Sequence, residues 1–398
     1  MSDGLPAPTD HDGMAVVARQ GDRICLVRNH ELTADEGPRC TVPGGEYNPN
    51  EWGGTTNLIF NLKTQRFEKS YVSLGGTIRN CAGGPTPWNS WISCEETFHE
   101  WNERVDGFRH GYIFEVPGFG ISTGQPIRAA GRFSHEAVAV DPLTAIVYET
   151  EDTKEAGFYK YVQPGAGVGT RLKPNQLADG GELFAMVIRG SSRFDLTQSF
   201  PMGTTFDVSW QLVEDPEGIQ GHAFDSAPDA AVISRGEGCW YDAGKIYFVS
   251  TDGGDAGLGQ VWAYDPVSEQ LTLVYESNDA NDVDGPDNIA ISSRGGIILC
   301  EDGDSDPKRL VGLDQAGSTF EFARNNMSLS RNDLAGIDRI FPGTQANFWD
   351  ELSSDNKADS FTDKEWAGAT FYGDWLFVNI QSPGVTFAIT GPWSSGLL

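Results

Sequence analysis

The sequence predicts an all-β fold, a six-bladed β-propeller. Two observations favour this fold: hairpin-like segments recur along the chain, and glycine, proline and aromatic residues are abundant. The chain has 398 residues, with Gly 48, Pro 21 and aromatics at 11%, a composition typical of short strands joined by tight turns. Because large all-β domains reach this size as one unit, we expect a single domain over residues 1–398.

The repeated segments share one layout, in which an alternating apolar run, a turn and a second β-rich run end on polar residues. They span 11–31, 79–96, 134–152, 235–252, 285–302 and 366–381. Their spacing is irregular, so we expect a degenerate repeat with insertions around 165–230 and 325–362. A ring of four-stranded blades would leave no long exposed sheet edge. The alternative is a β-sandwich or several small β domains.

Propeller geometry brings particular residues together. The first strand of each blade lines the channel, so residues just before it and just after the second strand meet at one mouth. The sequence places the following residues there: Glu31; Cys81 with Glu95 and Glu96; Glu136 with Glu149, Glu151 and Asp152; Arg235 and Glu237 with Asp252; Asp287 and Asn288 with Glu301 and Asp302; and Asn379 with Gln381.

The predicted mouth is rich in carboxylates, which repel one another unless cations neutralise them. Taken singly, each acid could be an ordinary surface charge, but recurrence at one hairpin position favours a metal site. Oxygen ligands suit Ca²⁺, whereas the thiol of Cys81 indicates a softer metal such as iron. Arg235 is the single cation of the predicted ring, and its planar fork suits phosphate oxygens.

The overall composition excludes some partners and leaves the location open. The formal net charge is -29, which makes nucleic acid and anionic membranes poor partners. We expect no membrane span, because no apolar run of about 18 residues occurs. No signal peptide is visible, which indicates a cytoplasmic protein or a numbering that begins after an export signal. Cys25, Cys94, Cys239 and Cys300 are expected to be buried free thiols.

Longer motifs make the sequence similar to a known family. They are His11-Asp12-Gly13-Met14, Asn29-His30-Glu31, Gly53–Leu58, Gly76–Gly84 continuing to Cys94-Glu95-Glu96, Ser134-His135-Glu136, Arg235-Gly236-Glu237, Pro286-Asp287-Asn288, Cys300-Glu301-Asp302, Val378–Gly384 and Ile389–Trp393. With these motifs the chain resembles the PhoX-type alkaline phosphatases over nearly its whole length. The stretch from Asn80 to Glu96 is the most specific part of the resemblance.

The resemblance implies a phosphatase that hydrolyses phosphate monoesters at a cluster of iron, as two ferric ions, and several calcium ions. Carried over by motif, Cys81, Glu136 and Glu237 look like iron ligands, and Arg235 looks like the phosphate clamp. The calcium side would be formed by Glu96, Glu301, Asp287 and Asn288. A small phosphorylated substrate and a monomeric protein are expected. The chain is short for the family and lacks the twin-arginine leader of its periplasmic or extracellular members.

Two other functions compete with this interpretation. The run from Gly285 to Ala290 is similar to the channel motif of calcium-dependent lactonases of the gluconolactonase type. A non-catalytic, calcium-stabilised propeller would also account for the carboxylates. Cys81 distinguishes these functions, because a lactonase needs no thiolate ligand.

Overall fold

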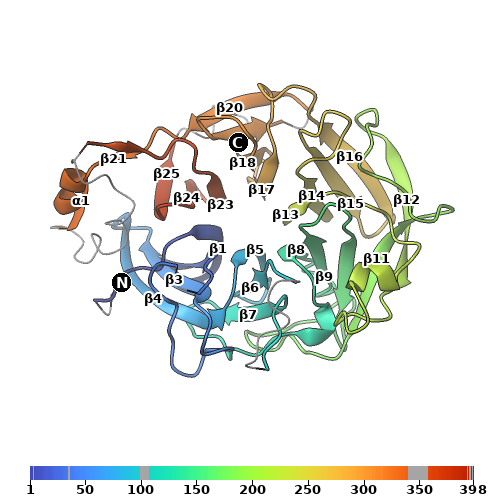
Figure 1. The fold of residues 1–398 in the computed structure, drawn as a ribbon, viewed down its shortest axis with the longest axis horizontal. Coiled ribbons are helices and arrows are strands. Elements are labelled where there is room, and N and C mark those ends of the chain that lie inside the picture. The colour runs from blue at the N-terminus through green and yellow to red at the C-terminus, as the bar shows by residue number, and fades with distance from the viewer. Residues whose placement is uncertain are drawn as a thin grey trace.

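The computed structural model describes residues 1–2, 4–34, 36–98, 107–314, 316–338, 357–391, 393, 396 and 398. Within these residues the structure is almost entirely antiparallel β-sheet, and the strands surround a central axis (Figure 1). The predicted all-β class is confirmed. Residues 339–356, which form part of the insertion predicted around 325–362, lie outside the described residues. The prediction of a single domain stays a prediction.

The described strands follow one another along the chain in groups, which we number I to VI. Group I contains β1 (His11–Gln20), β2 (Arg23–His30), β3 (Gly53–Asn61) and β4 (Arg66–Thr77), and group II contains β5 (Asn80–Pro85), β6 (Ser90–Glu95) and β7 (Ile113–Pro117). Group III contains β8 (His135–Val140), β9 (Val147–Glu151), β10 (Phe158–Val162), β11 (Glu182–Ile188) and β12 (Thr205–Leu212). Group IV contains β13 (Gly236–Asp242), β14 (Lys245–Ser250), β15 (Gln260–Asp265) and β16 (Gln270–Glu276). Group V contains β17 (Pro286–Ile291), β18 (Ile297–Glu301), β19 (Arg309–Leu313) and β20 (Thr319–Arg324), and group VI contains β23 (Trp366–Tyr372), β24 (Trp375–Ile380) and β25 (Val385–Thr390).

The remaining described elements are short. They are the 3-10 helices η1 (Arg128–Ala130) and η2 (Ala223–Ser226), the helix α1 (Arg331–Asp338), and the pair β21 (Ser328–Leu329) and β22 (Asp359–Ser360). The pair and α1 follow group V in the chain, and α1 lies at the periphery of the ring (Figure 1). No helix in the described part of the chain is long and apolar enough to cross a membrane.

Each predicted hairpin is present as the first two strands of its group. The hairpin of group IV shows why the chain turns there. Asp242 pairs with Lys245, and the two residues between them, Ala243 and Gly244, have φ of 47° and 87°. Positive φ at both central residues gives the turn a twist that matches the flanking strands.

The first strands of the groups face the axis and close the ring. β1 contacts β5, β5 contacts β8, and the series continues through β13, β17 and β23 back to β1. Among the described strands, outer strands join only two of the groups directly: β12 of group III pairs with β16 of group IV, which makes one nine-stranded sheet.

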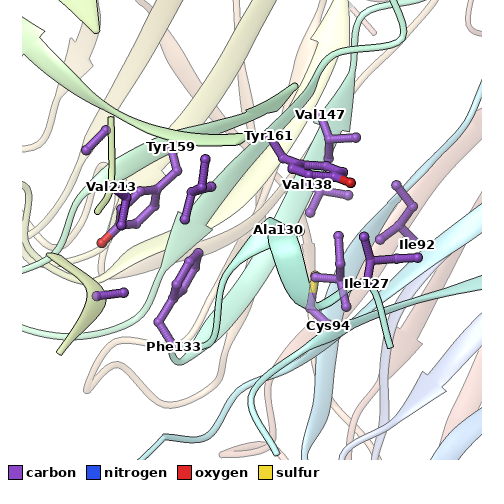
Figure 2. Close-up of a cluster of buried hydrophobic side chains, with 14 of the residues drawn as sticks. Ile92, Cys94, Ile127, Ala130, Phe133, Val138, Val147, Tyr159, Tyr161 and Val213 are labelled. Carbon is purple, nitrogen blue, oxygen red and sulfur yellow. The ribbon is translucent and has the colours of Figure 1, made fainter. Parts of the chain in front are cut away.

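Apolar side chains fill the spaces between neighbouring groups. The cluster between groups II and III contains Ile92, Cys94, Val138, Val147 and Tyr159, which point toward one another from facing sheets (Figure 2). Similar clusters lie between III and IV, IV and V, V and VI, I and II, and I and VI. The hydrophobic core is therefore distributed around the ring. The four cysteines predicted to be free are buried thiols.

Candidate metal centre

A β-bulge occurs at the same place in the first strand of each group. In β1, His11 faces His30 and Met14 faces Arg28, so two residues of β1 lie opposite one residue of β2. The equivalent register shift occurs in β5, β8, β13, β17 and β23. A bulge bends its strand and re-aims a side chain. The first bulged residues are Asp12, Cys81, Glu136, Glu237, Asp287 and Gly368.

A second position recurs just after the second strand of each of groups I to V. Its occupants are Glu31, Glu96, Asp152, Thr251 and Asp302, and each donates its backbone N–H to the residue two positions before the bulge, at 2.8 to 3.0 Å. These two positions bring the start of one strand and the end of the next to the same mouth. In four of these five groups, both positions carry a potential metal ligand.

The potential ligands form a continuous chain of overlapping triads. Within each triad the ligand atoms lie within 4.8 Å of one another. The triads are Asp12–Glu31–Cys81, Cys81–Glu96–Glu136, Glu136–Glu237–Asp287 and Asp287–Asp302–Glu365. Cys81, Glu136 and Asp287 are each shared by two triads, so neighbouring ions could be bridged by common ligands.

Glu136 lies at the centre of this chain of triads and is fully buried. Neither of its carboxylate oxygens has a hydrogen-bond partner among the described residues. Buried polar groups are nearly always paired, and an unpaired buried carboxylate is especially unfavourable. A cation between Glu136 and its neighbours would supply the missing partner.

The protonation of the cluster follows from burial and mutual repulsion. Burial, and then the nearby Asp287, raises the pKa of Glu136 and of Glu237 well above the usual range. Burial, and then Asp302, raises the pKa of Asp287 to about 8. A bound cation would favour the ionised forms and reverse these shifts.

Cys81 is the thiol of the cluster. Its Sγ donates to Oδ2 of Asp12 at 3.2 Å. Burial, and then the charges of Asp12 and Glu136, raises the pKa of the thiol well above its usual value. Without a cation the thiol is therefore neutral, whereas a coordinating metal would hold it as thiolate.

Arg235 lies beside the cluster at the entrance to β13. Its Nε donates to Oδ1 of Asp152 at 3.1 Å, and its Nη2 donates to Oε1 of Glu237 at 2.7 Å. Nη1 has no hydrogen-bond partner among the described residues, and the side chain is 33% exposed. The guanidinium thus holds a potential ligand while it presents free N–H groups.

The structure brings together five of the predicted ligands: Cys81, Glu96, Glu136, Glu237 and Asp287. It does not group Glu301 and Asn288 with them. Glu301 accepts two hydrogen bonds from Arg309, both at 2.7 Å, and Asn288 is the second, buried residue of its bulge.

Sequence reasoning placed Glu31 and Asp302 at the predicted mouth without naming them as ligands, and it placed neither Asp12 nor Glu365 there. The spacing within the hairpins could have found three of them, because Asp12, Glu31 and Asp302 occupy the same two hairpin positions as Cys81 and Glu96. Glu365 is the residue before β23, and no repeated sequence pattern marks it as a ligand. The prediction of a single cation in the ring was wrong, because Arg79 contacts Glu31 and Glu96.

Comparison with known proteins agrees with the resemblance seen in the motifs. A structure of Pseudomonas fluorescens PhoX in complex with vanadate, a transition state analogue, matches with a TM-score of 0.60 and 17% identity. That match covers 96% of this chain and 88% of that chain. A luciferin-regenerating enzyme matches with a TM-score of 0.33 and 9% identity, covering 98% of this chain and 94% of that one.

An oligogalacturonate lyase in complex with manganese matches with a TM-score of 0.36 and 11% identity over 100% of both chains. No curated protein matches the sequence. The family model for alkaline phosphatase PhoX matches residues 49–384. Because this match spans most of the chain, the protein belongs to the alkaline phosphatase PhoX family.

Proposed function

We propose that the protein is a metal-dependent phosphatase that hydrolyses phosphate monoesters. Membership of the PhoX family supports the class of reaction. The observation that carries the proposal is Glu136, a fully buried carboxylate without a hydrogen-bond partner among the described residues, surrounded by a thiol and further acids. This donor set fits bound cations, which would neutralise the ionised acids and the thiolate.

We further interpret the ring as a six-bladed β-propeller with one blade for each of groups I to VI. Contacts between successive first strands, and apolar clusters between successive groups, support this interpretation. The metal cluster would then lie at the mouth of the central channel, where the bulges of the inner strands meet.

The cluster's residues fit a mixed set of metals. Cys81, Glu136 and Glu237 would hold iron, since the thiol and the shared carboxylate suit the softer and more Lewis-acidic ion. Oxygen-only donors such as Asp287, Asp302 and Glu365 would hold calcium, and Glu96 could serve either. Calcium-ligand roles for Glu301 and Asn288 stay predictions. When bound, the metals would neutralise the phosphate and stabilise the attacking and leaving oxygens.

The protein's own groups would orient the substrate. Arg235 would donate from Nη1 to a phosphate oxygen, while its Nε and Nη2 stay bonded to Asp152 and Glu237. These two bonds would orient the guanidinium before the phosphate binds. That orientation lowers the entropic cost of binding and favours the charge of the transition state. The alcohol product would leave toward solvent, on the side where Arg235 is exposed.

Metal analysis combined with two activity assays tests the proposal. We expect wild-type protein to contain iron and calcium and to hydrolyse p-nitrophenyl phosphate, with weaker activity on the bis-ester. Cys81→Ala should lose iron and phosphatase activity. Cys94→Ala is the matched control, because Cys94 is a buried thiol of the same hairpin outside the triads. Calcium without iron, together with lactone hydrolysis that survives Cys81→Ala, would overturn the proposal in favour of a lactonase.

A further inference from the structure

We propose that Arg79 is a second phosphate-binding arginine of this site and acts together with Arg235. The inference rests on the proposed phosphatase, and it names a residue that motif reasoning did not assign to the substrate. Its basis is a repeat within the structure: Arg79 and Arg235 occupy the same position of two different strand groups.

The backbones of the two arginines agree in position, in φ and in their hydrogen bonds. Each lies two residues before a first bulged residue, Cys81 or Glu237, with φ of 46° at Arg79 and 47° at Arg235. The carbonyl of each accepts a backbone N–H from the end of the second strand of its own group, at 2.9 Å. The N–H of each donates to the preceding group, to the carbonyl of Leu32 at 3.0 Å or of Thr153 at 2.8 Å.

One ion pair of each arginine is equivalent as well. Arg79 contacts Glu31 at 2.8 Å, and Arg235 contacts Asp152 at 3.1 Å. Glu31 and Asp152 occupy the same position after the second strand of groups I and III. Each arginine also contacts a potential metal ligand, Glu96 for Arg79 and Glu237 for Arg235. The two guanidinium groups therefore approach the chain of triads from two different groups.

Both guanidinium groups keep donors for a ligand. Arg79 uses Nε and Nη2 for its contacts with Glu96 and Glu31, and Arg235 uses the same two nitrogens for Asp152 and Glu237. Among the described residues neither Nη1 has a hydrogen-bond partner. The side chains are 37% and 33% exposed, so both can be reached from solvent. A guanidinium nitrogen with free N–H groups beside a metal cluster suits phosphate oxygens.

The fold alone does not require an arginine at this position. The equivalent residues of groups I, III and V are Asp10, Ser134 and Gly285, and their hairpins form with the same bulge. The arginines occur in groups II and IV, which flank the group that supplies Glu136. A phosphate that approaches this acidic mouth would thus meet positive charge on two sides.

Binding of inorganic phosphate to metal-loaded protein tests the inference without any need for turnover. Arg79→Gln should raise the dissociation constant about tenfold or more, since a charge-assisted hydrogen bond is lost. Arg79→Lys keeps the charge and the contacts with Glu31 and Glu96 but loses the fork, so it should fall between Arg79→Gln and wild type. Arg128→Gln is the matched control for the loss of one positive charge, because Arg128 pairs with Glu217 outside the triads, and its phosphate affinity should equal that of wild type.

Elemental analysis of the same samples separates substrate binding from ligand positioning. Full metal content with weakened phosphate binding in Arg79→Gln supports the inference. Unchanged phosphate affinity at full metal content overturns it. Loss of metal from both Arg79→Gln and Arg79→Lys also overturns it, because Arg79 would then only hold Glu96 and Glu31. If wild type binds phosphate but hydrolyses no monoester, the proposed function fails while the role of Arg79 is still measured.

Discussion

Replacing Asp287 with asparagine should stabilise the metal-free protein and weaken its response to metal. Asp287 belongs to two triads, and burial followed by the charge of Asp302 raises its pKa from 3.8 to about 8. The folded state therefore holds the proton more tightly than the unfolded state does. Stability from this carboxyl is complete below pH 3.8 and is lost as the pH rises to about 8.

The size of the effect follows from these two pKa values. Each pH unit between them lowers the free energy of unfolding by about 1.4 kcal/mol. At pH 7 the metal-free wild type has therefore lost about 4 kcal/mol, and at pH 5 about 2 kcal/mol. Asparagine has the shape of the neutral acid and does not titrate. Asp287→Asn should recover these amounts in the chelator-treated protein.

Urea denaturation at both pH values, with and without added calcium, measures the effect. Without metal, we expect Asp287→Asn to have a larger free energy of unfolding than wild type. Added calcium should raise that free energy less in the variant, because a ligand charge is lost. Asp304→Asn, at an exposed aspartate near the same strand group, controls for the removal of one negative charge. Equal stability of wild type and Asp287→Asn in chelator at pH 7, or a difference that does not grow with pH, would refute the reasoning.

Three further predictions concern positions around the ring. Gly368→Ala should lower stability by about 2 kcal/mol and reduce activity, because φ is +60° and its Cβ would lie 2.4 Å from the carbonyl oxygen of Asp12; urea denaturation measures it. Glu115→Ala should lower stability by about 3 kcal/mol or more in the same assay, since this buried carboxylate accepts four hydrogen bonds. His222→Asn should flatten the dependence of stability on pH above pH 6.5: although burial lowers the pKa of His222, the hydrogen bond to Glu151 raises it above its ordinary value of 6.5, so the stability that the protonated ring contributes is lost as the pH rises through the raised pKa.

Each of these predictions has a defined contrary result. Gly373 has φ of 57° with nothing near its Cβ, so Gly373→Ala should cost less than Gly368→Ala. Equal losses would mean that conformational strain, and not the contact with Asp12, dominates. A change below about 1 kcal/mol for Glu115→Ala would mean that water replaces the carboxylate. If the stability of His222→Asn depended on pH as that of wild type does, a group other than His222 would be responsible for the dependence.

The sequence predicted the hairpins and several of the residues that lie together in the triads. Alternating apolar runs and turn residues mark the strands, and the acid at one hairpin position marks Glu136 and Glu237. The choice between Glu301 and Asp302 could not be made in the same way. Neighbouring residues of a strand end point in opposite directions, and only the pairing of β18 with β19 and its side-chain contacts show that Glu301 lies against Arg309.

Other parts of the site depend on contacts between distant segments. Glu365 reaches Asp302 and Asp287 from another strand group, and no local pattern reports such a meeting. The role of Arg79 becomes visible only when its backbone is compared with that of Arg235, because the residues around the two arginines differ. Long-range pairing such as that of β12 with β16 is likewise not encoded in a local period.

The pairing of β12 with β16 makes the ring mechanically uneven. It joins groups III and IV into one hydrogen-bonded sheet, whereas no ladder between outer strands joins the other neighbouring groups in the part of the chain that the structure describes. Glu136 and Glu237 project from the two joined groups, so their separation is held by a stiff support. Asp12 and Cys81 come from groups I and II, which are joined by separate hydrogen bonds, such as those from Asn29 to the carbonyls of Cys81 and Ala82, and not by a strand ladder. We therefore expect Glu136 and Glu237 to hold their spacing more firmly than Asp12 and Cys81 when an ion binds.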